Sequence, residues 1–466
     1  MTTEYPSFRD PAFLASHVSS VLGFWTRPEA LAPEGGMVHC RNDDGSVFDT
    51  DTRHLVSSTR LVINFALAIA NDVPCPDPLG WRPHLDSSLK FLRERHFISA
   101  TGGYRWELYL SDEARSDATN RSYGLCFALM AYAASFIAGV SEAAAWVGEA
   151  AATLNERFWE EGHGLYADEA SQDWATIDPY RGQNANMHAV EAHMLAYRAL
   201  QEPWHLERAR CIAWNMCVRQ AALVDAATGC GPLVYEHYST SWAPDLAFNA
   251  DKPKDLFKPF GFQPGHLAEW AKLLLQLDVV DAAQGEAPSV GGTGAIVDGA
   301  AGGGRSGDAC APSGAEEPGW RLATAARFFD VAVASGWDER GGGGLVYSCR
   351  PEPGLPRLDN DKYKWVSCEA IAAAVLLATA PGATAEQRAR YLGWYDKLWR
   401  HAWEHLVDHE HGSWFRLRGP ANEALLDNPK CQPGKVDYHV VTMGIDAANA
   451  LRGLGVNYSS SFERKV

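Results

Sequence analysis

A single pattern recurs six times along this chain and limits the folds open to it. Each unit contains an amphipathic helix, a glycine turn with short extended segments, a polar loop and a more apolar helix. The glycine turns fall near residues 36, 103, 163, 230, 343 and 412. Their spacing is about 60 to 70 residues, with one interval of about 113, and such recurrence is typical of repeat architectures.

The one long interval has a compositional cause. Residues 281–318 include 25 Gly, Ala, Ser or Pro among 38 positions, and this composition cannot bury enough apolar surface to stay ordered. We therefore predict a flexible surface insertion over 281–318, with no role in chemistry.

Six helical pairs whose second helices are the more apolar predict a closed ring. The apolar helices would line the inside, and amphipathic partners such as 385–407 would form the outer layer. Hairpin signals lie in the polar loops. We predict an all-α chain that forms one catalytic domain over residues 1–466, with short β-hairpins in the loops on one side of the ring.

Charge and composition exclude several classes of partner. The chain has 41 Lys and Arg against 58 Asp and Glu, a formal net charge of -17, which argues against nucleic acid or an anionic membrane. The first residues lack the basic and then apolar pattern of a secretion signal. The apolar run 123–140 is rich in Ala and Ser, as expected for a buried helix. Ten cysteines without a CxxC pair predict a reduced, cytoplasmic protein.

The segment 181–191, RGQNANMHAVE, changes from a polar string to an apolar helical pattern. Asn184 or Asn186 can cap the helix. His188 and Glu191, three residues apart, would then share one face of its first turns. A lone HxxE is more often a surface pair than a site, so this segment alone decides little.

A second HxxE pair strengthens the case. The segment PGHLAEW begins another apolar helix, with Pro264 suited to the first turn and His266 and Glu269 three residues apart. If every polar loop enters its inner helix on the same side of the ring, one mouth receives the side chains of Arg60, Tyr123, His188, Glu191, His266, Glu269, Trp365, Glu369 and His439.

Such a mouth would suit proton transfer on a polyol. Histidine can take and return a proton near neutral pH because its unperturbed pKa is about 6.5. No GxSxG, P-loop, GxGxxG or HExxH motif is present. A zinc or iron site formed by the histidines with Glu191 and Glu269 is one alternative, although the histidines come from separate units. A glycosidase with two carboxylates is another.

Four segments resemble, in order, the motifs of the N-acylglucosamine 2-epimerase superfamily, and within it the branch of mannose isomerases and related aldose–ketose isomerases. The likeness covers residues from about 24 to about 445. The resemblance implies an (α/α)6 barrel and a reaction through a cis-enediol that needs neither metal nor cofactor. The matching segments are RGQNANMH with Glu191, PGHLAEW, the pattern of Lys364, Trp365 and Glu369, and KVDYH ending in His439.

The resemblance also implies roles for single residues. The positions of His266 and His439 match the acid/base pair of the family, and we expect His439 to act on carbon and His266 on oxygen. Glu269, one turn after His266, would orient it. Arg60 would hold the enediolate oxygens. The residues expected to bind the sugar are His188, Asn184, Tyr123, Trp365, Glu369 and Lys258.

One departure from the family bears on the substrate. The epimerase branches usually have a tryptophan four residues before the arginine that matches Arg60, whereas this chain has Val56. The leading expectation is therefore an isomerase that interconverts D-mannose and D-fructose, with D-lyxose and D-xylulose as a further pair. The alternatives are isomerisation of sulfoquinovose, 2-epimerisation of N-acylglucosamine or cellobiose, and a non-enzymatic sugar-binding protein. The sequence does not predict an oligomeric state.

Overall fold

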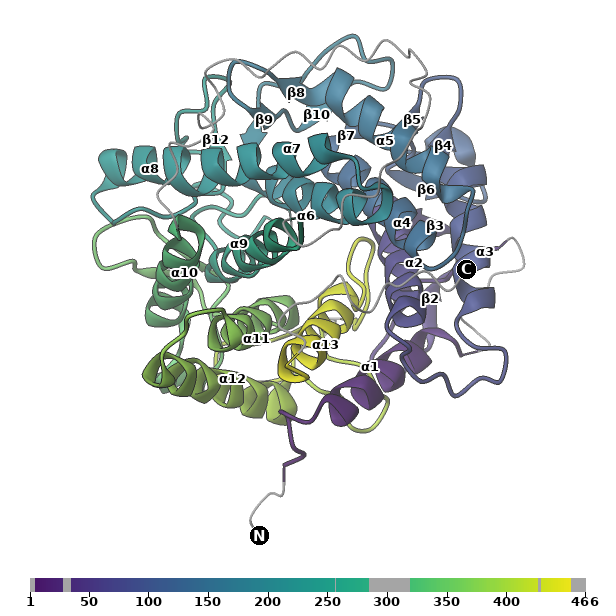
Figure 1. Ribbon diagram of the computed structural model, residues 1–466. Helices are drawn as coiled ribbons and strands as arrows, with labels where there is room; N and C mark the ends of the chain where they lie inside the picture. The colour runs from purple at the N-terminus through teal and green to yellow at the C-terminus, as the bar shows by residue number, and fades with distance from the viewer. Residues whose placement is uncertain (1–4, 28–34, 256, 285–318, 426–428, 454–466) are drawn as a thin grey trace.

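Twelve helical rods form two layers in the computed structural model, which describes residues 5–27, 35–255, 257–284, 319–425 and 429–453 (Figure 1). The inner helices are α2 (Leu55–Ala70), α4 (Ser122–Ile137), α6 (Gln183–Leu200), α9 (Pro264–Gln284), α11 (Lys364–Thr379) and α13 (Tyr438–Leu451). The outer rods are α1 (Pro11–Trp25), α3 (Arg82–Phe91) with η2 (Leu92–His96), α5 (Ala143–Phe158), α7 (Pro203–Trp214) with η4 (Asn215–Gln220) and α8 (Ala221–Thr228), α10 (Trp320–Gly336) and α12 (Ala385–His405).

The inner helices form a series that closes on itself. Helix α2 packs on α4, α4 on α6, α6 on α9, α9 on α11, α11 on α13, and α13 again on α2. Each outer helix packs mainly on one inner helix: α3 on α2, α5 on α4, α7 on α6, α10 on α9, α12 on α11, and α1 on α13. Figure 1 shows the resulting α/α barrel nearly along its axis.

The two layers differ in how much of each helix is buried. Nearly all residues of α11, KWVSCEAIAAAVLLAT, are buried, and its small alanines allow neighbouring helices to approach closely. Helix α12 instead buries one stripe that includes Tyr391, Tyr395 and Leu398, as an amphipathic surface helix does. Its first turn is fixed by a capping box between Thr384 and Gln387. The sequence pattern therefore predicted correctly which helices lie inside.

Short antiparallel strands join the loops at the mouth. Four two-stranded sheets connect the loop of one helical pair to the loop of the next, and four others are hairpins within one loop. Single bridges, Phe262 with Cys349 and Arg41 with Cys431, complete the connections around the ring. The joining sheets are β3 (Thr52–His54) with β6 (Glu107–Tyr109), β7 (Asn120–Arg121) with β10 (Glu169–Ala170), β11 (Arg181–Gly182) with β12 (His237–Tyr238), and β15 (Lys362–Tyr363) with β16 (Leu417–Arg418). The hairpins are β1 (Cys40–Arg41) with β2 (Val47–Asp49), β4 (Phe97–Ile98) with β5 (Gly103–Tyr104), β8 (Trp159–Glu160) with β9 (Leu165–Tyr166), and β13 (Ser348–Cys349) with β14 (Arg357–Asp359).

The joining strands fix where the inner helices begin. Strands β3, β7, β11 and β15 end at the residue before α2, α4, α6 and α11, respectively. Because each strand is hydrogen-bonded to a neighbouring loop, the entrances of these helices are held on the same side of the ring.

Two expectations need adjustment. Helix α9 continues to Gln284, so residues 281–284 are helical, and the rest of the expected insertion, 285–318, lies outside the described residues. Eight described cysteines are free, but Cys211 is in a disulfide, so the expectation of a fully reduced chain is wrong at that residue. No helix in the described part of the chain is long and apolar enough to cross a membrane.

Buried histidines predict a stability that depends on pH. Burial is the largest cause lowering the pKa of His39 to about 3 and the pKa of His96 and His205 to about 4. The unfolded chain then binds more protons than the folded chain between pH 6.5 and about 4, so the free energy of unfolding falls as pH falls through this window. Each pKa unit is worth about 1.4 kcal/mol per histidine.

Urea unfolding at pH 7.0 and pH 5.0 should show this loss of stability. His96→Gln, which removes one such group, should reduce the difference between the two pH values. A His96→Gln variant with the same difference between the two pH values as the wild type would contradict the assignment of a neutral, buried His96.

Candidate active site

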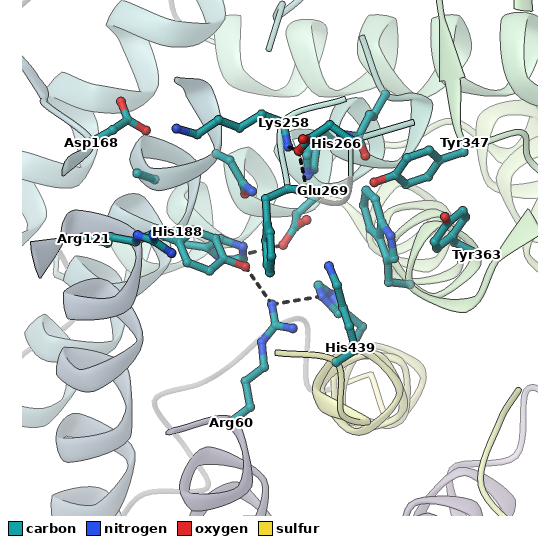
Figure 2. Close-up of a pocket in the computed structure, with 18 of the residues that line it drawn as sticks. Arg60, Arg121, Asp168, His188, Lys258, His266, Glu269, Tyr347, Tyr363 and His439 are labelled. Atoms are coloured by element: carbon teal, nitrogen blue, oxygen red, sulfur yellow. Dashed lines mark hydrogen bonds and ion pairs between the residues drawn. The ribbon is translucent and has the colours of Figure 1, made fainter. Parts of the chain in front are cut away.

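A cavity of about 420 Å³ lies at the mouth, where the inner helices begin (Figure 2). Most of the side chains expected there do line it: Arg60, Tyr123, Asn184, Lys258, His188, His266, Glu269, Trp365 and His439. Within the described residues, Glu191 and Glu369 are not part of the lining and contact histidines from behind. Six inner helices thus deliver polar side chains to one place.

His439 has a carboxylate on one ring nitrogen and an open position on the other. Its Nδ1 lies 2.6 Å from Oε1 of Glu369, and its Nε2 lies 3.5 Å from Nη2 of Arg60. Burial, followed by the charges of Arg60 and Lys272, holds the pKa of His439 well below its usual range. A neutral ring that donates Nδ1–H to the carboxylate leaves Nε2 able to accept a proton.

Arg60 is held at the same side of the cavity. It donates from Nη1 to the carbonyl of Gly434 and from Nη2 to the hydroxyl of Tyr123, both at 3.1 Å. Its guanidinium also lies 4.5 Å from the ring centre of Phe127. Figure 2 shows this guanidinium between the His188 side and the His439 side of the cavity. A fixed cation here can stabilise negative charge on a bound oxygen.

His266 is oriented by a residue that was not expected. Its Nδ1 lies 2.9 and 3.0 Å from the two carboxylate oxygens of Glu236, in the loop before β12. Gln183 donates to the same carboxylate at 3.0 Å. Burial alone would raise the pKa of Glu236, but His266 and Gln183 outweigh it and lower that pKa. The expected orientation of His266 by Glu269 is therefore wrong.

Glu269 instead presents a carboxyl group to the cavity. Neither of its oxygens has a hydrogen-bond partner among the described residues, and the nearest basic nitrogens, on His188 and Lys272, are 4.0 and 3.9 Å away. Burial, followed by the neighbouring carboxylate of Glu369, raises the pKa of Glu269 well above its usual range. A carboxyl that stays protonated at neutral pH can donate a hydrogen bond to a sugar oxygen.

His188 and Glu191 form the pair predicted from their spacing. Their Nδ1 and Oε2 atoms are 3.0 Å apart, and the hydroxyl of Tyr438 donates to the other oxygen of Glu191 at 2.6 Å. Burial is the main cause that lowers the pKa of His188 to about 4.

The expected asparagine cap is wrong, because α6 begins at Gln183 with Gly182 as its cap residue.

Aromatic and charged side chains complete the wall. The ring centre of Trp365 lies 4.8 Å from that of His266 and 5.8 Å from that of His439, so one indole separates the two histidines. Lys258 forms an ion pair with Glu169 at 2.7 Å and is not an isolated loop charge. The lining residues that sequence reasoning missed include Trp106, Asp168, Tyr180, Tyr347, Tyr363, Arg416 and Lys435. They lie in loops that carry no helical spacing.

Two groups of side chains have donor atoms close enough together for a metal ion. They are His188 with Glu191 and Glu269, and Glu269 with Glu369 and His439. The ammonium of Lys272 lies 2.7 Å from Glu369 and within 4 Å of Glu191 and Glu269. A cation from the protein itself therefore already balances these carboxylates, which favours the metal-free expectation but does not test it.

The unusual state of Glu269 predicts a specific stability change. Because its pKa is raised in the folded state, its contribution to stability is lost as pH rises above the unfolded value of about 4.3, by about 1.4 kcal/mol per pH unit up to the folded pKa. Glu269→Gln mimics the protonated acid and should gain stability relative to the wild type between pH 5 and pH 8.

Glu236→Gln is the matched control for urea unfolding. The pKa of Glu236 is lowered, so this variant should lose the same stability at pH 5 and pH 8. A Glu269→Gln difference that does not grow with pH would show that Glu269 is ionised in the folded protein.

Comparisons with known proteins agree with this geometry. The family model for N-acylglucosamine 2-epimerase (GlcNAc 2-epimerase) matches residues 36–292 and 311–443. A D-mannose isomerase from Marinomonas mediterranea is 40% identical over 440 residues, which are 94% of this chain and 97% of that protein. A crystal structure of a D-mannose isomerase has a TM-score of 0.80 and 38% identity, and the match covers 95% of this chain and 99% of the other. Cellobiose 2-epimerase from Spirochaeta thermophila shares the fold, with a TM-score of 0.73 and 20% identity over 97% of this chain and 100% of the other. The chain therefore belongs to the N-acylglucosamine 2-epimerase family.

Proposed function

We propose that this protein is an aldose–ketose isomerase that interconverts D-mannose and D-fructose through a cis-enediol, with D-lyxose and D-xylulose as a further pair. The observation that carries the proposal is the placement of His266 and His439 on one cavity. They flank Trp365, and each has its Nδ1 on a buried carboxylate. Two such groups can move two protons on one open-chain sugar.

His439 is assigned to carbon because its ring is held neutral by burial and two nearby cations. Its Nε2 accepts the proton from C2 of the aldose and returns it to C1, which gives the ketose. The intermediate between these steps is the enediol. One base can serve both carbons because C1 and C2 of a planar cis-enediol present the same face to it.

His266 is assigned to the oxygens. As C2 loses its proton, O1 becomes an alkoxide-like oxygen. The imidazole of His266 donates a proton to O1 and later removes the proton from O2. Glu236 fixes the ring for this task through the hydrogen bonds at Nδ1.

Arg60 and Glu269 stabilise the charge that develops on the sugar. The guanidinium lies beside Nε2 of His439, where the oxygens of the reacting carbons would be bound. The carboxyl of Glu269 can donate to the same region. Donors fixed before the reaction stabilise the transition state more than the substrate, which is how they accelerate the chemical step.

The remaining wall would bind hydroxyl groups and the carbon face of the sugar. We assign Asn184, His188, Tyr123, Trp365 and Lys258 to these contacts, because all of them line the cavity. Glu369, which was expected to contact the sugar, is better explained as the partner of His439.

The architecture supports one catalytic unit. We infer that the twelve rods are six hairpins of an (α/α)6 barrel and that residues 1–466 form a single domain around the cavity. The cyclic packing of α2, α4, α6, α9, α11 and α13 supports this inference.

An anionic sugar is the second candidate substrate. Arg416 and Lys435 line the cavity in addition to Arg60. Burial, followed by the charges of Arg60 and Arg416, lowers the pKa of Lys435 to about 7. A sulfonate on the substrate would be attracted by Arg60 and Arg416 and would favour the protonated form of Lys435, so sulfoquinovose is included among the sugars to be tested.

Chelator-treated protein should convert D-mannose into D-fructose. Progress curves by HPLC on D-mannose, D-lyxose, N-acetylglucosamine, cellobiose and sulfoquinovose should show the highest kcat/KM for D-mannose. Accumulation of D-glucose without D-fructose would identify an epimerase, and a higher kcat/KM for sulfoquinovose would identify the anionic sugar as the substrate. If none of these sugars gives a ketose, the proposal is wrong.

His439→Asn should remove turnover and leave binding. We expect kcat to fall by a factor on the order of 10⁴, the upper end of general acid–base catalysis, while the Kd of D-mannose by calorimetry changes little. His163→Asn, in the turn between β8 and β9, is a control that should match the wild type. Turnover by His439→Asn close to that of the wild type would exclude His439 as the base.

A further inference from the structure

Lys272 is a buried cation below the cavity that the mechanism above does not use. It lies on α9, two turns after His266, and its side chain is 1% exposed. Its ammonium contacts carboxylates from three inner helices. Nζ lies 2.7 Å from Glu369 on α11, 3.8 Å from Glu191 on α6 and 3.9 Å from Glu269 on α9.

Two of these carboxylates connect Lys272 to histidines of the cavity. Glu369 binds Lys272 through Oε2 and His439 through Oε1. Glu191 faces Lys272 with Oε1 and binds His188 through Oε2. Lys272 is therefore linked to His439 through Glu369 and to His188 through Glu191. Its contact with Glu369 is much shorter than its contact with Glu191.

The charge of Lys272 opposes the effect of burial on Glu369. The pKa of Glu369 is raised overall, because burial is the largest cause that raises it; Lys272 is the largest cause that lowers it and so limits the rise. The reverse also holds, because burial alone would lower the pKa of Lys272, while the carboxylates hold it well above its usual range. Each partner thus depends on the other to stay charged.

The protonation of Glu369 determines the tautomer of His439. An ionised carboxylate can only accept, so Nδ1 of His439 must carry the proton and Nε2 is free to act as a base. A protonated Glu369 would donate to Nδ1, and the neutral imidazole would then carry its proton on Nε2. That tautomer cannot accept the proton of C2.

We propose that Lys272 is a positioning residue that keeps Glu369 ionised, so that His439 holds its proton on Nδ1 and presents an unprotonated Nε2 to the sugar. This inference rests on the proposed isomerase function. The charged and titratable groups around the pair are Glu191 and His188 on α6, Glu269 on α9, His439 and Asp446 on α13, and Arg60 on α2.

Lys272→Met tests the proposal because methionine keeps an unbranched chain and removes the charge. The acid limb of the kcat/KM profile should move to higher pH, since Glu369 would then ionise only at higher pH. We expect kcat to fall on the order of 100-fold at pH 7, with partial recovery at pH 9 and a small change in KM. A loss that is equal at every pH would show a purely structural role and overturn the proposal.

Lys430→Met is the matched control. Lys430 is equally buried and forms an ion pair with Asp408 at 2.5 Å, but it does not line the cavity. The Lys430→Met variant should lose stability and keep the pH profile of the wild type.

In the background of Glu369→Gln, Lys272→Met should cause little further loss of kcat, because the residue through which Lys272 acts is already neutral.

Nitrogen-15 NMR of histidine in the wild type keeps the proposal testable if Lys272→Met does not fold. The His439 signals, identified by their loss in His439→Asn, should show a protonated Nδ1 and an unprotonated Nε2 at pH 7. The opposite tautomer would overturn the proposal. If the wild type produces no ketose, the proposed function is wrong. If the wild type turns over and the pH profile of Lys272→Met is not shifted, only the proposed role of Lys272 is wrong.

Discussion

Charged groups inside a ring of apolar helices have little water to stabilise them, and this constraint shapes the whole site. A buried charge is tolerated only with a partner of opposite sign or with full hydrogen bonding. Glu369 accordingly lies between His439 and Lys272, and Glu191 lies between His188 and Tyr438. The carboxyl of Glu269 has no hydrogen-bond partner among the described residues, and it meets the same constraint through a raised pKa that favours its neutral form.

The same constraint makes the two assigned catalytic histidines different. His439 lies beside Arg60 and close to Lys272, so its neutral form is favoured and it suits the removal of a weakly acidic carbon proton. His266 has the carboxylate of Glu236 on its Nδ1, which fixes the orientation of its ring. The backbone pairing between neighbouring loops keeps both groups in place, because it fixes where the inner helices begin.

The sequence allowed much of this architecture to be predicted, because hydrophobic period and glycine turns are local signals. The six repeats predicted a closed ring and the helices of its inner layer. The spacing of His188 and Glu191 predicted a contact that the structure contains. The same reasoning failed for His266, although it has the same spacing to Glu269. Its ring is directed toward the loop that carries Glu236, thirty positions away in sequence, and no local pattern reports such a contact. The three helices that meet at Lys272 could not be foreseen for the same reason.

The central claim is that one base moves a proton between neighbouring carbons of the sugar. Conversion of unlabelled D-mannose in deuterium oxide tests it most directly, with the D-fructose analysed by proton and deuterium NMR. Exchange of the histidine proton with solvent during the lifetime of the enediol predicts D-fructose that carries deuterium at C1. D-fructose that still carries only protium at C1 after many reversible turnovers, as a direct hydride shift from C2 would give, would contradict the account.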